Sequence, residues 1–166
     1  MPKRVALLSA LVALGVAAPA AAQQKVADLG DMLAASDQCI SATGASGVSS
    51  KIMEQGGWKL GSVSAKGKAV DMPLRIYGKA DNNALIMAQN DASTKDRVCI
   101  VLGRIASPQA YAPAAAAMTK KYGKPIKRNG NSVIWRFKNK IIQLDATGSP
   151  KKAAMRIAII EASGGK

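Results

Sequence analysis

Apolar residues recur along this chain with two different spacings, one typical of helices and one typical of strands. The helical spacing occurs in three segments. Apolar side chains recur every three or four positions from Lys25 to Ser36 and again from Ser46 to Gln55, which predicts two amphipathic helices. The paired glycines Gly56-Gly57 are expected to end the second helix. A third helix is predicted after Ser107-Pro108, because serine caps helices and proline fits the first turn. Its apolar stripe extends to Tyr122.

A period of two predicts strands in the middle of the chain. From Val70 to Tyr77 every second residue is apolar, as in a strand with one buried face, and Leu74 and Ile76 are expected to face the core. Further strands are predicted at Ala84 to Gln89 and at Arg97 to Gly103. The latter is apolar at consecutive positions, which predicts a central strand covered on both faces.

The last third of the chain predicts a three-stranded meander. Trp135 and Phe137 share one face of its first strand, and a two-residue turn at Asn139-Lys140 pairs Phe137 with Ile142. This register places apolar residues opposite one another, and the third strand follows at Ala154 to Glu161. We therefore interpret the two aromatic side chains as core residues and not as a stacking platform.

The order of these elements predicts the class of fold. A helix followed by three strands occurs twice, at residues 46–103 and 107–161, without a residue-by-residue repeat. We expect an α+β domain whose antiparallel sheet or sheets are built from two helix-plus-three-strand meanders, with the helices packed on one face.

The first 22 residues have the three-part pattern of a secretory signal peptide. Two basic residues precede an uncharged run that ends at Ala18, and small residues follow up to Ala22, where cleavage is expected. The run is shorter than the roughly 20 residues that cross a bilayer as a helix, although an uncleaved anchor is the alternative. Residues 23–166 are then expected to form a single domain with no transmembrane segment and to be periplasmic or secreted.

The two cysteines, Cys39 and Cys99, are interpreted in the light of this export. In an oxidising compartment we expect them to form a disulfide. Two buried free thiols are the alternative, because Cys99 lies within an apolar run. Their spacing matches neither a C-x-x-C redox motif nor a zinc site.

Charge is divided unevenly along the chain. The sequence has 24 lysines and arginines against 10 acids, a net charge of +14. Residues 103–166 hold 13 of these cations and only two acids, Asp145 and Glu161, whereas residues 23–102 are close to neutral. A surface of one sign attracts partners of the other sign. The alternative is that the charge only keeps the protein soluble.

The residue types exclude several chemistries. The chain contains no histidine, which removes histidine triads, histidine metal ligands and imidazole acid-base catalysis. Ser149 and Lys152 match an S-x-x-K motif, but Pro150 places them in a predicted turn. Asp71 and Asp145 have no spacing that indicates a catalytic pair. We therefore predict no catalytic residue, no metal site and no cofactor.

The remaining candidate site is electrostatic. Eight cations of the C-terminal half are predicted to form an anion-binding surface around the last meander: Lys124, Lys127, Arg128, Arg136, Lys138, Lys151, Lys152 and Arg156. Arginine would bind a planar carboxylate or phosphate, and lysine would add point charge. A solvated sheet face is the other interpretation.

Together these observations predict a small exported binding or interaction protein that is not an enzyme. Its basic C-terminal half is expected to contact an anionic envelope component or an acidic protein. An exported hydrolase using carboxylate or lysine chemistry is the first alternative. An exported nucleic-acid binder is the second, although export and the predicted burial of Trp135 argue against it.

Overall fold

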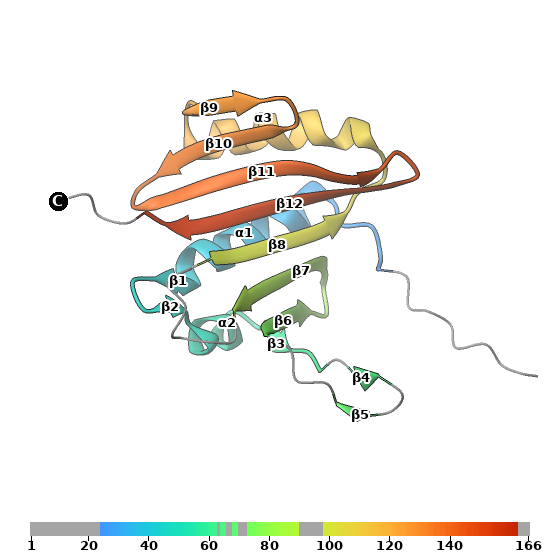
Figure 1. Ribbon diagram of the computed structural model, residues 1–166, viewed down its shortest axis with the longest axis vertical. Helices are drawn as coiled ribbons and strands as arrows, with labels where there is room; N and C mark the ends of the chain where they lie inside the picture. The colour runs from blue at the N-terminus through green and yellow to red at the C-terminus, as the bar shows by residue number, and fades with distance from the viewer. Residues whose placement is uncertain (1–23, 63, 66–67, 70–72, 90–97, 163–166) are drawn as a thin grey trace, which may run out of the picture.

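The computed structural model describes residues 24–62, 64–65, 68–69, 73–89 and 98–162, and the predicted signal peptide lies outside these ranges. In them the chain forms an eight-stranded sheet of order β3-β6-β7-β8-β12-β11-β10-β9, with neighbouring strands antiparallel (Figure 1). Its strands are β3 (Lys59–Leu60), β6 (Leu74–Lys79), β7 (Asn82–Gln89), β8 (Val98–Arg104), β9 (Lys127–Asn129), β10 (Ser132–Phe137), β11 (Lys140–Ser149) and β12 (Lys152–Glu161).

Two small hairpins and four helical segments complete the described chain. The hairpins are β1 (Thr43–Gly44) with β2 (Gly47–Val48) and β4 (Ser64–Ala65) with β5 (Lys68–Ala69). The helices are α1 (Leu29–Ala42), α2 (Ser50–Gln55), the 3-10 turn η1 (Pro108–Ala110) and α3 (Tyr111–Tyr122). The predicted α+β class with an antiparallel sheet is confirmed. Each half contributes four strands to the sheet, where the sequence pattern predicts three.

The first helix begins and ends later than its apolar spacing predicts. The Ala27 N–H donates to the Arg104 carbonyl at 2.8 Å, so the chain before the helix lies extended beside β8. Asp28 then caps α1, and with Asp31 it forms a reciprocal capping box. The second helix also starts late, because residues 43–48 form a hairpin and Ser49 supplies the cap.

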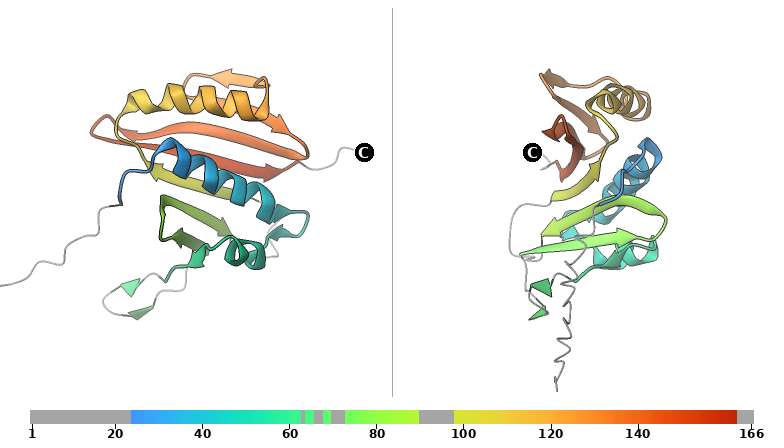
Figure 2. Two further views of the ribbon diagram at one scale, coloured as in Figure 1. Left: turned by 180° about the vertical axis from the view of Figure 1, so that it is seen from behind. Right: turned by 90° about the vertical axis from the view of Figure 1, so that its right-hand side faces the viewer.

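The core lies between the sheet and the two longer helices. Figure 2 shows α1 and α3 on the same face of the sheet. On that face, called here the helix face, buried side chains of neighbouring strands stand opposite one another, as Val101 does with Ile157. Trp135 pairs with Ile142 and is 0% exposed. Its interpretation as a core residue is confirmed.

Close packing and a covalent bond hold α1 on the sheet. A Cβ atom at Gly103 of β8 would lie 2.4 Å from the Met32 sulfur, so only glycine allows this helix to approach so closely. Cys39 of α1 and Cys99 of β8 form the predicted disulfide, with their Cα atoms 5.7 Å apart. Both cysteines are fully buried.

The expected orientation of β6 is wrong. Tyr77 is fully buried on the helix face, whereas Ile76 pairs with Met87 on the opposite face. The polar atoms of the inward residues form hydrogen bonds on the helix face. The Tyr77 hydroxyl lies 3.0 Å from the Ser50 hydroxyl. Arg75 Nη2 likewise donates to the Val48 carbonyl at 3.1 Å. Alternation predicted which residues share a face, but not which face is inward.

The expected turn between β10 and β11 is displaced. It consists of Lys138-Asn139, with Lys138 at φ 54°, and Phe137 pairs with Lys140 instead of Ile142. The register differs from the prediction by two residues. Since side chains alternate with a period of two, every residue keeps its predicted face.

The face of the sheet opposite the helices, called here the open face, is covered by no helix of the described chain (Figure 2). The strand β8 is central, as predicted, with β7 on one side and β12 on the other. Its helix-face residues are buried, but Ile100 and Leu102 on the open face remain partly exposed. The expectation that this strand is covered on both faces is therefore wrong, because both long helices lie on one side.

Candidate functional site

Both acids of the basic C-terminal half, Glu161 and Asp145, form ion pairs with cations of the same half. Lys140 pairs with Glu161, and their side chains are only 7% and 10% exposed. Arg156 Nη2 lies 2.7 Å from Asp145 Oδ2 on the open face. The exposed cations of this half other than Arg156 are therefore not compensated, within the described residues, by acids from the same half.

Asp145 is the acid with the most hydrogen-bond partners on the open face. Arg156 donates to Oδ2 from two nitrogens, at 2.7 and 3.1 Å, and Gln143 donates to Oδ1 at 2.9 Å. Burial raises the pKa of this carboxyl, but hydrogen bonds from Gln143, Arg156 and Ser132, together with the Arg156 charge, outweigh it and hold the pKa below its ordinary value. This carboxylate accepts hydrogen bonds from its neighbours and is unsuited to act as a proton donor at neutral pH.

A lowered pKa makes Asp145 a source of acid-sensitive stability. Its contribution is complete above the ordinary pKa of about 3.9 and is lost as the pH falls through the lowered value. We expect Asp145→Asn to be less stable than the parent at pH 7 and to lose less stability between pH 7 and pH 3. Urea unfolding midpoints at both pH values measure this. Asp81→Asn, at a carboxylate 77% exposed, is the control, and equal acid losses in the parent and Asp145→Asn would contradict the expectation.

The structure does not bring together all eight cations predicted as an anion site. By strand register four of them lie on the open face: Lys127, Arg136, Lys152 and Arg156. Arg128 pairs with the buried Val133 and so belongs to the helix face. Lys124, Lys138 and Lys151 lie in connections between elements.

Three of the eight lie at opposite ends of β11. Lys138 lies in the turn before β11, and Lys151 and Lys152 lie at the turn after it (Figure 1). The strand between them has 10 residues, which at about 3.3 Å per residue separates the two groups by roughly 30 Å. A single anion of ordinary size therefore contacts only one of the two groups.

The larger group is called here the basic edge and consists of Lys124, Lys127, Arg136 and Lys138. All four side chains are exposed, and none forms an ion pair within the described residues. Lys127 and Arg136 are diagonal neighbours across the β9–β10 pair, a relation that separates residues by about 7 to 8 Å. An extended anionic surface can contact both. Cations on an edge strand such as β9 also discourage unwanted strand pairing, which is the purely structural interpretation.

Beside the basic edge, the open face is largely apolar. Its partly exposed apolar residues, called here the apolar rows, are Leu74, Ile76, Leu85, Met87, Val98, Ile100, Leu102, Ile134, Ile141, Ala154, Ala158 and Ile160. Contiguous exposed apolar surface on a protein is often an interaction site. The sequence does contain a signal for this apolar surface, because the residues of β8 are apolar on both faces. Sequence reasoning interpreted that pattern as a strand covered on both sides.

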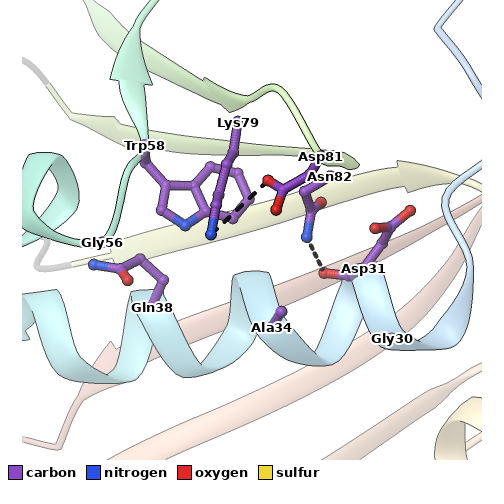
Figure 3. A pocket seen from close by; sticks show the side chains of 9 residues that line it. All are labelled: Gly30, Asp31, Ala34, Gln38, Gly56, Trp58, Lys79, Asp81 and Asn82. Carbon is purple, nitrogen blue, oxygen red and sulfur yellow. Dashed lines mark hydrogen bonds and ion pairs between the residues drawn. The ribbon is translucent and has the colours of Figure 1, made fainter.

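A small pocket lies on the other side of the molecule, between α1, the end of α2 and the β6–β7 turn. It has a volume of about 230 Å³. Figure 3 shows the nine residues that line it: Gly30, Asp31, Ala34, Gln38, Gly56, Trp58, Lys79, Asp81 and Asn82. Sequence reasoning missed this pocket, because its residues come from separate elements and form no local motif.

The described residues offer no metal site, since no three of their His, Cys, Asp or Glu side chains lie close enough to share an ion. None of the described helices has the length and apolar character to cross a membrane. No protein-family model, curated protein or solved structure matches this chain.

Proposed function

We propose that this is an exported, periplasmic or secreted, non-enzymatic binding protein. Its basic edge and apolar rows dock on an anionic lipid surface of the cell envelope. The observation that supports this most is the juxtaposition on the open face of uncompensated cations with apolar side chains, while both acids of the same half are already paired. The proposal keeps the interpretation of the domain as two helix-plus-strand meanders. The C-terminal meander is the one that binds the lipid surface.

The combination of charge and apolar surface favours a lipid surface over an acidic protein. Anionic head groups attract each lysine or arginine near the membrane surface by about 1 kcal/mol. Apolar side chains next to those cations gain free energy when they leave water for the acyl boundary. A purely hydrophilic acidic partner would use the cations alone and leave the apolar rows in water.

Binding to vesicles tests this proposal. The purified protein is expected to sediment with vesicles that contain phosphatidylglycerol but not with phosphatidylcholine vesicles, and to be released by high salt. Replacing two cations in Lys127→Gln/Arg136→Gln removes about 2 kcal/mol of attraction, so affinity should fall roughly 30-fold. The matched control, Lys151→Gln/Lys152→Gln, makes the same charge change at the distant turn and should leave affinity much less affected.

The outcomes separate the partners. Equal losses in the two double variants would show that only total charge matters and would contradict docking through the basic edge. The apolar rows are tested with Ile134→Gln/Ile141→Gln, which is expected to weaken vesicle binding further. If that variant binds as the parent does, and polyglutamate competes with the vesicles, the partner is an acidic protein instead. If the protein binds neither vesicles nor polyglutamate, the proposal is wrong. The cations of the basic edge then serve only to prevent unwanted pairing of the edge strand β9.

A further inference from the structure

The pocket beside α1 is lined by a hydrogen-bond donor that pairs with no group of the described chain. Trp58 is only 2% exposed, yet its indole N–H makes no hydrogen bond within the described residues. Figure 3 shows that Trp58 and Lys79 line the same pocket. A ligand acceptor in the pocket would gain a hydrogen bond from this N–H.

The Lys79 ammonium is also available to a ligand. Its nearest carboxylate oxygen, on Asp81, is 3.9 Å away, which is beyond hydrogen-bond distance, and the Asp81 side chain is 77% exposed. Trp58 and Lys79 therefore give the same pocket two donors. One carboxylate accepts from both, because each of its two oxygens has free lone pairs.

Acceptors line the rest of the pocket. Asp31 lies at the end away from Trp58, and Asp81 lies within 3.9 Å of Lys79 (Figure 3). One oxygen of Asp31 accepts from the Asp28 N–H at 3.2 Å, and the other makes no hydrogen bond within the described chain. Gln38 donates its amide N–H to the Ile52 carbonyl at 2.7 Å, so it presents an oxygen to a ligand.

The position of the Gln38 amide depends on a glycine. A Cβ atom at Gly56 would lie 2.0 Å from the Gln38 side-chain oxygen, so any larger residue would displace the amide. The pocket is therefore lined by both donors and acceptors.

We propose that this pocket binds a small zwitterion, a free α-amino acid. Its carboxylate accepts from Trp58 and Lys79, and its ammonium group donates to Asp31 and Asp81. The volume of about 230 Å³ is below the range of about 300 to 1,000 Å³ that holds drug-sized ligands. The site lies in the N-terminal half, on the opposite side of the sheet from the apolar rows, so it is independent of the proposed membrane docking.

Calorimetric titration of the full protein with individual amino acids tests the proposal. We expect binding of amino acids with small or basic side chains, and no binding of acetate or methylamine, which each carry only one of the two charges. Trp58→Phe keeps the ring and removes the N–H, so affinity should fall roughly tenfold or more. Lys79→Met should cause a similar loss, whereas Lys51→Met, at an exposed lysine of α2 that does not line the pocket, should bind as the parent does.

NMR supplies a second measurement that does not depend on stability. The chain has two tryptophans, and the indole N–H resonance that Trp58→Phe removes should be the one that moves on titration. Acetate binding as tightly as an amino acid would show a simple anion site and overturn the zwitterion proposal. Unchanged affinity in both Trp58→Phe and Lys79→Met, or no heat and no indole shift with any amino acid, would also overturn it.

Discussion

Removal of the Cys39–Cys99 disulfide is expected to lower the free energy of unfolding by about 4 kcal/mol. The two cysteines are 60 residues apart, so the bond removes much of the freedom of the unfolded chain. It also ties α1 to the central strand β8. Urea unfolding of Cys39→Ala/Cys99→Ala measures the loss, which should appear as a lower midpoint together with a changed dependence on denaturant, because the unfolded state becomes more expanded.

A reductant provides the control for this prediction. It should destabilise the parent protein and have no effect on the double variant, which has no disulfide to reduce. Both cysteines are 0% exposed in the folded protein, so reduction of the parent is expected to be slow until the chain unfolds. A double variant with the parent's midpoint would show that non-covalent packing alone keeps α1 on the sheet.

Much of the fold could be predicted from local periodicity. A period of two in the sequence identified the inward positions of β10, β11 and β12, and an error of two residues in the turn left those positions unchanged. Helix ends were less predictable. The start of α1 depends on the pairing of Val26 with Arg104, two residues far apart in the sequence.

The errors arise where tertiary contacts decide between two local possibilities. The pattern of β6 fits either face, and the inward face is chosen by partners for Arg75 and Tyr77 that the local sequence does not contain. The open face is a second example. Apolar residues on both sides of β8 are compatible with two covering layers, whereas both long helices pack on one side (Figure 2).

The candidate site shows the same limit. Composition predicted the excess of cations in the C-terminal half, but the compensation of Arg156 by Asp145 depends on the β11–β12 register. The separation of Lys151 from the basic edge depends on strand length. The pocket beside α1 could not be predicted at all, because Trp58 and Lys79 share a site only after the sheet has formed.

The Lys140–Glu161 pair is expected to give the second largest loss when one partner is removed. The two residues stand opposite each other at the ends of β11 and β12, and their side chains are 7% and 10% exposed. Asn139 also donates to Glu161 at 2.6 Å. Glu161→Ala leaves a buried ammonium without a counter-ion, which should destabilise the protein by about 3 kcal/mol in urea unfolding.

Replacing both partners should restore most of this loss, because the cost lies in the unpaired charge. Lys140→Met/Glu161→Leu fills similar volume with apolar groups and is expected to come within about 1 kcal/mol of the parent. A double variant as unstable as Glu161→Ala would show that the pair itself holds the two strands together. The double change removes one charge of each sign and leaves the basic edge intact, so vesicle affinity should stay at the parent's value. Stability and binding are thereby separated, since the buried pair supports the fold while the exposed cations remain free to meet a partner.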